Sequence, residues 1–215
     1  MKIRAGEKPT FIFSKQILPP IDSSSAPAMI ELGAGWCDFA AYCRDKGYRV
    51  SIADKDIGKI EKAKQLGFPA ERLDLNNLLP YKDSSFDGCA MLEVIEHIVK
   101  AEDLVVEISR ILKNDAFFIL TTPNPAYYPF RLKALFGFGP REEGYHYRFF
   151  TKKRLIKLLR DGGFEIKIFS GFGYIPLVSG AMLKLKNYCF QFYIPSILQA
   201  LFANRFVVLA RNRKK

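Results

Sequence analysis

The sequence predicts an α/β fold in which helices flank a mostly parallel sheet. In the first half of the chain, short apolar runs alternate with stretches whose apolar residues recur at helical spacing. This alternation is typical of strand–helix–strand units, because neighbouring parallel strands need a long crossover connection. The chain has 215 residues, of which 49% are hydrophobic and 26% are charged. These values are typical of a globular protein with its own core, and they exclude a wholly disordered chain.

The predicted elements of the first half follow from the apolar runs and the residues that end them. Residues 28–32 form a buried strand that ends at Gly33 and Gly35. After it come a helix at 38–46, a strand at 48–53 that closes on Asp54, a helix at 57–66, a short strand ending at 72–74 and a strand at 86–92. One helical face is then shared by Leu104, Ile108, Ile111 and Leu112, and a fifth strand covers 116–121.

The second half is less regular. Residues 124–150 form a long aromatic loop, which we interpret as a functional insertion because plain connections are shorter. Thr151 caps a basic amphipathic helix at 152–160, and two late strands cover 164–169 and 206–210. We therefore predict one domain over 1–215, with a core at about 26–170, a last strand at 205–211 and an insertion at 171–204.

Positive charge is concentrated in the second half. Residues 131–215 carry 17 Lys and Arg but only 4 Asp and Glu, and the net charge of the whole chain is +11. This asymmetry indicates an anionic partner, namely a phospholipid surface, a phosphorylated substrate or nucleic acid; a solubilising surface is the alternative.

The insertion at 171–204 has two interpretations. Its residues 187–204 are uncharged, but Pro195 and several polar residues disfavour a transmembrane helix. The segment either lies in a headgroup layer as an amphipathic element or covers the site as an apolar lid. No CxxC pair and no apolar signal region occur, so we expect a cytoplasmic protein, with peripheral contact at the inner membrane face if the first interpretation holds.

A glycine-rich turn follows the first strand. The segment ELGAGW at 31–36 places Gly33 and Gly35 between a strand and a helix, where a backbone approaches a nucleotide closely. Asp54 lies 21 residues after Gly33, at the end of the next strand, where a carboxylate accepts both hydroxyls of a ribose. The dinucleotide fingerprint is incomplete because Asp38 stands at its third glycine, and no P-loop sequence follows. A plain tight turn is the remaining alternative.

The chain resembles the class I S-adenosylmethionine-dependent methyltransferases over about 26–170. The matching segments are ELGAG at 31–35, Asp54, the pair DL at 74–75, LPY and SFD at 79–87, EVIEHI at 93–98, and the helix and strand up to TPN at 122–124. The resemblance implies a Rossmann-like, seven-stranded sheet and S-adenosyl-L-methionine as cofactor. It assigns cofactor binding to Gly33, Gly35 and Asp54, with Glu31, Asp74 and Leu75 in support. Cys37 departs from the pattern, since many members carry a third glycine there.

The two histidines of the chain are predicted near the same sheet edge. His97 follows the fourth strand within the motif Glu93-x-x-Glu96-His97, and His146 lies in the aromatic loop. Two carboxylates and an imidazole at this spacing suit a base or a divalent cation. Similar motifs bind a metal in some ubiquinone-biosynthesis O-methyltransferases and RNA 2′-O-methyltransferases, whereas many relatives carry the pair without one. We name Glu93, His97 and His146 as catalytic candidates and assign no metal ligand; a purely structural role is the alternative for each histidine.

These observations predict a methyltransferase that acts on the oxygen of a small, lipid-associated or sugar-like acceptor. An RNA 2′-O-methyltransferase is a second hypothesis, based on the basic second half and the ExxEH motif, but that half is apolar rather than rich in scattered Arg and Lys. A cofactor-binding scaffold without turnover is a third hypothesis. Nucleic acid is thus the less favoured partner, after a lipid-linked acceptor and an anionic membrane surface.

Overall fold

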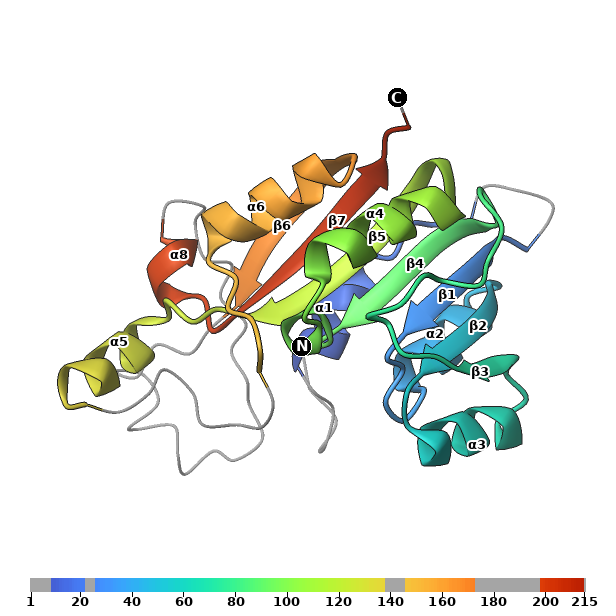
Figure 1. The fold of residues 1–215 in the computed structure, drawn as a ribbon, viewed down its shortest axis with the longest axis horizontal. Coiled ribbons are helices and arrows are strands. Elements are labelled where there is room, and N and C mark those ends of the chain that lie inside the picture. The colour runs from blue at the N-terminus through green and yellow to red at the C-terminus, as the bar shows by residue number, and fades with distance from the viewer. Residues whose placement is uncertain (1–8, 22–25, 138–145, 173–197, 215) are drawn as a thin grey trace.

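The computed structural model describes residues 9–21, 26–137, 146–172 and 198–214. Seven strands form one sheet in the order β3-β2-β1-β4-β5-β7-β6, in which only β7 runs antiparallel to its neighbours (Figure 1). The strands are β1 (Ala28–Leu32), β2 (Arg49–Asp54), β3 (Ala70–Arg72), β4 (Phe86–Leu92), β5 (Leu112–Pro123), β6 (Phe164–Phe172) and β7 (Arg205–Asn212). The predicted α/β class and the seven-stranded, mostly parallel sheet are confirmed.

Helices cover both faces of the sheet (Figure 1). One face carries α4 (Ala101–Ile111) and α6 (Lys152–Asp161), whose buried leucines and isoleucines pack on Phe118 and Phe206. The other face carries α2 (Asp38–Asp45) and α3 (Ile57–Gln65), with α1 (Pro9–Ile17) against β5 and β7. The central strands are apolar on both sides because both faces are covered, as expected for a parallel sheet.

The strand order positions the site. The neighbours of β1 are β2 on one side and β4 on the other. The connection that leaves β1 therefore runs toward β2, whereas the connection that leaves β4 runs toward β5, in the opposite direction along the sheet. At such a switch point the loops after the two strands separate and leave a crevice at the carboxyl edge of the sheet. The glycine turn after β1 and the segment after β4 therefore face the same space.

Several elements differ from the sequence prediction. β5 begins at Leu112 rather than at 116, because Leu112 pairs with Phe86 and leaves the α4 face on which it was predicted. A helix, α5 (Tyr128–Leu135), lies within the predicted loop; its Pro129 at the first turn is compatible with a helix start, and Gly137 follows its end. The helix α1 was not predicted from sequence. It packs on the sheet through Phe13, whose ring stacks on Phe172 at 4.7 Å between centroids.

The insertion predicted at 171–204 lies largely outside the described residues. Of that range, the structure describes the end of β6, the short helix α8 (Gln199–Phe202) and the residues around it. Within the described chain, no helix is both long enough and apolar enough to cross a membrane.

Candidate active site

The glycine turn after β1 is tightly built. The Gly33 amide donates to the carbonyl of Ala53 on β2 at 2.7 Å, and Gly33 has a positive φ of 74°. A Cβ at Gly33 would lie 2.4 Å from a methyl of Val94, so no side chain fits there. At Gly35, by contrast, a Cβ would meet no atom within 4 Å. The turn therefore packs against the segment after β4 on one side and leaves open space on the other.

Cys37 stands where many related sequences have a third glycine, and it adopts a backbone conformation that favours glycine. Its φ is 65°, the left-handed conformation that favours glycine, and it precedes the first residue of α2. Its side chain is buried, and its amide donates to the carbonyl of Ala34 at 2.8 Å. The backbone thus keeps the shape that a third glycine would allow, at the cost of about 1 kcal/mol of strain.

A pocket of about 460 Å³ opens at the switch point. Five of the six predicted cofactor residues line it, and they come from the ends of β1, β2 and β3. The segment after β4 closes the opposite wall. The lining includes Gly33, Gly35, Asp54, Asp74, Leu75, Leu92, Glu93, Val94, His97, Ile98 and Tyr147.

Asp54 presents a buried carboxylate to this pocket. It is 5% exposed, and its Oδ1 accepts the Asp56 amide at 3.0 Å. The Lys59 ammonium lies 3.8 Å from its other oxygen, Oδ2. The carboxylate is thus fixed by the loop after β2 while it borders the pocket, which suits a ligand with hydroxyl donors.

Asp74 and Leu75 form the side of the pocket beyond Asp54. The Asp74 carboxylate accepts two hydrogen bonds from Asn76, from the amide at 3.0 Å and from the side chain at 2.9 Å. These bonds lower the pKa of Asp74 below its usual value. Leu75 is buried beside them and provides an apolar surface that suits a purine ring.

Glu31 does not line the pocket. It is 2% exposed, and burial raises the pKa of its carboxyl to about 8. Its Oε2 is buried and lacks a hydrogen-bond partner among the described residues. Glu31 therefore lies behind the glycine turn, where it can support the turn without lining the pocket.

Glu93 is held by a residue that sequence reasoning missed. The Arg205 guanidinium, on β7, donates to Glu93 Oε2 at 2.6 Å. The Glu93 amide donates to the carbonyl and the hydroxyl of Thr121, and Glu93 has a positive φ of 59°. The other carboxylate oxygen, Oε1, is buried without a partner among the described residues. Since Arg205 lies 112 residues further along the chain, only the antiparallel position of β7 brings it to this site.

Glu96, His97 and His146 form one cluster beside the pocket. The two imidazole rings lie 4.8 Å apart between centroids, and one ligand atom from each of the three residues falls within 4.8 Å of the others. Glu96 is 3% exposed; burial and the charge of Glu93 raise the pKa of its carboxyl to about 8, although the Thr122 hydroxyl donates to it at 3.1 Å. Such a set could hold a proton or a divalent cation.

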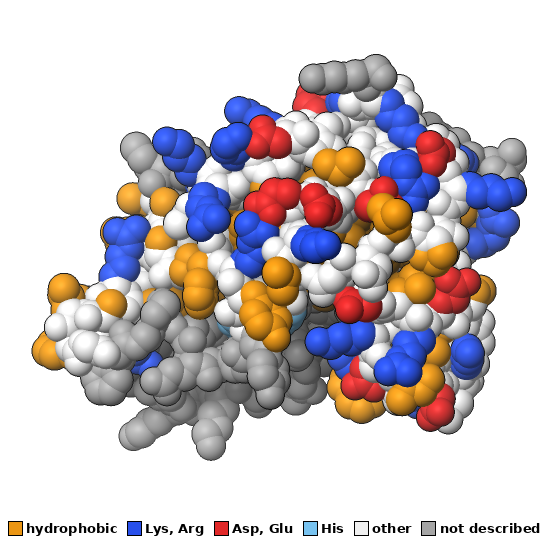
Figure 2. Space-filling view, viewed as in Figure 1, with side chains coloured by type: hydrophobic (Ala, Val, Ile, Leu, Met, Phe, Trp, Pro, Cys, Tyr) orange, Lys and Arg blue, Asp and Glu red, His pale blue; other side chains and the backbone are white. Residues whose placement is uncertain are grey.

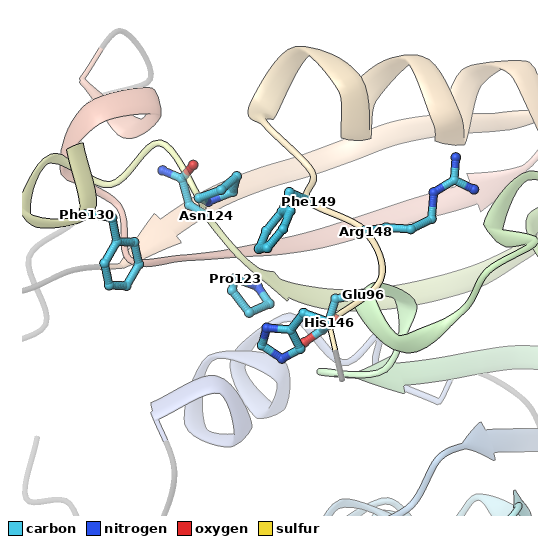
Figure 3. Close-up of a pocket in the computed structure, with 8 residues that line it drawn as sticks. Glu96, Pro123, Asn124, Phe130, His146, Arg148 and Phe149 are labelled. Atoms are coloured by element: carbon cyan, nitrogen blue, oxygen red, sulfur yellow. The ribbon is translucent and has the colours of Figure 1, made fainter. Parts of the chain in front are cut away.

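The segment 146–150 closes over this cluster. The amides of Tyr147 and Arg148 both donate to the Glu96 carbonyl, at 3.0 and 3.1 Å. Arg148 also forms an ion pair with Glu102 and donates to the Val99 carbonyl at 2.9 Å. In Figure 3 the His146 ring lies beside the Glu96 side chain, and Phe130 and Phe149 flank the same small cavity of about 10 Å³. These backbone hydrogen bonds to Glu96 hold His146 close to His97, because each histidine adjoins one of the bonded residues.

Comparison with known proteins identifies the class. Residues 30–120 match the family model of a methyltransferase domain. An uncharacterized methyltransferase of Bacillus subtilis, YodH, is 29% identical over 164 residues, which cover 71% of this chain and 66% of that protein. The chain thus spans just under two thirds of the length of that relative.

Solved structures share the fold. A methyltransferase of Mesorhizobium loti that depends on S-adenosylmethionine has a TM-score of 0.67 at 17% identity, covering 94% of this chain and 96% of its own. A second such methyltransferase, from Thermotoga maritima, has a TM-score of 0.68 at 21% identity, covering 94% and 89%. At these identities the likeness shows the fold.

Fold and pocket together define a Rossmann-like methyltransferase domain. Residues 30–120 match a methyltransferase domain, and the chain shares the fold of solved S-adenosylmethionine-dependent methyltransferases, which implies S-adenosyl-L-methionine as the cofactor. The pocket fits this compound, because Gly35 leaves space at the turn, the Asp54 carboxylate suits a ribose, and Leu75 suits an adenine.

Proposed function

We propose that this protein transfers the methyl group to an oxygen of a small, lipid-associated acceptor. The observation that carries the proposal is the position of His97, which lines the cofactor pocket and lies within one cluster with His146 and Glu96. An oxygen nucleophile must lose a proton, whereas many other nucleophiles need no base. The cluster supplies a proton acceptor where such an acceptor is needed.

The chain's own residues would act by orientation, proton transfer and exclusion of water. When bound, S-adenosylmethionine supplies an electrophilic methyl group on a sulfonium sulfur. Gly33, Gly35 and Asp54 would hold it, with Asp74 and Leu75 at the adenosine end. We assign to His97 the role of accepting the acceptor's hydroxyl proton, and the neighbouring His146 would share that proton. Displacement of a methyl group depends chiefly on such positioning.

The chemistry of the pocket wall supports an apolar acceptor. Around His97 the wall is formed by Leu92, Val94, Ile98 and Tyr147. Apolar walls with a few placed polar groups are typical of sites for aromatic or aliphatic ligands. This favours a lipid-associated acceptor over a free sugar. It also disfavours RNA, because the two lysines that line the pocket, Lys55 and Lys59, lie at Asp54 rather than around His97. We place the reaction in the cytoplasm at a membrane face.

The test is mass spectrometry of products after incubation with labelled S-adenosylmethionine and three extracts: lipids, polysaccharide precursors and total RNA. We expect label in the lipid extract, on oxygen. Label in RNA would establish the alternative 2′-O-methyltransferase, and no label in any extract together with intact cofactor binding would favour a non-catalytic scaffold.

Two variants test the assigned roles. His97→Ala should lower kcat by about 100-fold or more, the usual contribution of a general base. His146→Ala should lower kcat less, while its affinity for S-adenosylmethionine stays at the wild-type value, because His146 does not line that pocket. Chelator should leave turnover unchanged. Loss of turnover with chelator, restored by a divalent cation, would contradict the proton-acceptor assignment and would make the cluster a metal site.

A further inference from the structure

We propose that α5 and the residue after it, Phe136, dock this protein on an anionic phospholipid bilayer. Leu132, Leu135 and Phe136 would enter the headgroup layer, and Arg131 and Lys133 would face lipid phosphates. The proposal rests on the proposed function, since a bilayer would present a lipid-associated acceptor to the same edge of the protein. It assigns the docking to residues other than the insertion at 171–204.

The first argument is exposure. Leu132, Leu135 and Phe136 are 52%, 80% and 78% exposed, and no residue of α5 is buried. Their spacing of three and four residues places the three side chains on one face of the helix. Figure 2 shows a few hydrophobic side chains at the rim of this end of the molecule. A short helix with an apolar, unburied face needs a partner, because water alone does not stabilise it.

The second argument is contrast with the rest of the described surface. Elsewhere on the described surface the exposed large apolar residues are more scattered: Val106 lies on α4, Ile57 and Leu66 lie at opposite ends of α3, and Tyr147 and Phe149 lie beside the pocket. Single exposed apolar residues are ordinary on soluble proteins, whereas three on one helical turn indicate an interaction site. The α5 face is therefore a distinct surface feature.

Charge decides which partner fits this face. Between Asp115 and Glu142 the sequence contains no Asp or Glu, so α5 lies in an acid-free segment. Arg131 and Lys133 are both exposed on α5. Apolar side chains interleaved with cations are typical of helices that lie in the headgroup layer of anionic membranes. RNA would use the cations but not the two leucines, and a second copy of this cationic face would use the apolar side chains but not the cations.

The position of α5 connects this surface to the site. Phe130, on α5, lines the small cavity together with Glu96 and His146. In Figure 1, α5 lies beyond the end of β5, beside α8. Tyr147, which lines the cofactor pocket, is itself 59% exposed, and Val99, whose carbonyl accepts from Arg148, is 56% exposed. A bilayer that contacts α5 therefore meets an apolar rim beside the opening of the pocket.

The experiment is flotation of the full chain with vesicles. One set contains phosphatidylcholine alone, and the other contains about one third phosphatidylglycerol. The apolar variant is Leu132→Ser/Leu135→Ser/Phe136→Ser, and its matched control is Leu66→Ser/Val106→Ser/Ile168→Ser, which changes three exposed apolar residues on other elements. The charge variant is Arg131→Gln/Lys133→Gln, and its control is Lys64→Gln/Lys82→Gln, two exposed lysines elsewhere.

We expect the wild type to float with the anionic vesicles only. The floated fraction of both α5 variants should be at least about fivefold lower than that of the wild type, whereas both controls should float as the wild type does. Calorimetry with S-adenosylmethionine should give wild-type affinity for every variant, which shows that they are folded. This readout does not depend on methyl transfer, so a failed flotation and a failed acceptor assignment are distinguishable.

Three results would overturn the proposal. In the first, the wild type does not float. In the second, the α5 variants float as well as the wild type, which would assign docking to another segment such as 171–204. In the third, light scattering shows a dimer that the apolar variant dissociates without any change in flotation, which would make this face a contact between two copies.

Discussion

Asp54 allows a sharp test of the cofactor pocket, because a second aspartate two residues away has a different role. Asp54 lines the pocket with a buried carboxylate, whereas Asp56 is exposed and caps α3 by accepting the amides of Gly58 and Lys59. Replacement of either residue by alanine removes a carboxylate from the same loop. Only Asp54→Ala should change the affinity for S-adenosylmethionine.

The magnitude follows from the contacts. A hydrogen bond to a charged group contributes about 1.5–3 kcal/mol, so loss of one ribose contact should weaken binding by about 10- to 100-fold. Asp56→Ala should leave the affinity unchanged but lower the free energy of unfolding by about 1 kcal/mol, the usual cost of a lost helix cap. Asp54→Asn keeps an oxygen for the Asp56 amide and should fall between wild type and Asp54→Ala.

Calorimetry measures the affinity, and urea denaturation measures the stability. Trp36, the one tryptophan of the chain, adjoins Gly35 and is 70% exposed, so its fluorescence gives a second readout of binding at the glycine turn. Asp54→Ala with an affinity within about twofold of the wild type would refute the ribose assignment. An equal loss of affinity in Asp56→Ala would show that the loop, rather than the carboxylate, determines binding.

Two further predictions concern the glycine turn and the carboxyl behind it. Gly33→Ala should lower the free energy of unfolding by about 1–3 kcal/mol because its Cβ would overlap Val94. Gly35→Ala has open space for its Cβ but a positive φ of 54°, so it should cost about 1 kcal/mol of stability and, because Gly35 lines the pocket, should also reduce cofactor affinity. Calorimetry and urea denaturation of both variants separate these effects. Glu31 is protonated up to about pH 8 in the folded protein but ionises near pH 4.5 when unfolded, so its contribution to stability falls as the pH rises between these values. Glu31→Gln removes this contribution, and from pH 5 to pH 9 its stability relative to the wild type should rise by roughly 4 kcal/mol. A constant difference between the two unfolding free energies across that range would contradict the buried-carboxyl assignment.

The elements around the cofactor pocket were predictable because their signals are local. The strands β1, β2 and β4 are short, largely buried runs, and a pocket residue stands at the end of each. Parallel strands bring their carboxyl ends to one edge, so Gly33, Asp54 and Asp74 were expected to meet without any knowledge of tertiary contacts. Glu31 shows the limit of this reasoning, since residues in a strand alternate between faces and proximity in sequence does not place a side chain in the pocket.

The elements that escaped prediction depend on long-range contacts. α5 contains Pro129 and aromatic residues that are typical of a loop, yet its Tyr128 packs against Phe202 on α8. The start of β5 at Leu112 is set by pairing with Phe86, which competes with the helical pattern of α4. In both cases tertiary contacts decide between two local conformations that the sequence allows.

The strain at Glu93 shows why the acceptor side of the site depends on the last strand. A left-handed conformation is unfavourable for glutamate and persists only where surrounding contacts enforce it. Here Thr121 on β5 accepts the Glu93 amide twice, and Arg205 on β7 fixes its carboxylate. The charge held at Glu93 in turn helps to raise the pKa of Glu96 to about 8, which keeps a proton beside the two histidines near neutral pH. Arg205 is therefore coupled to the protonation of the cluster through two carboxylates, although it lies on the far side of β5 in the sheet order.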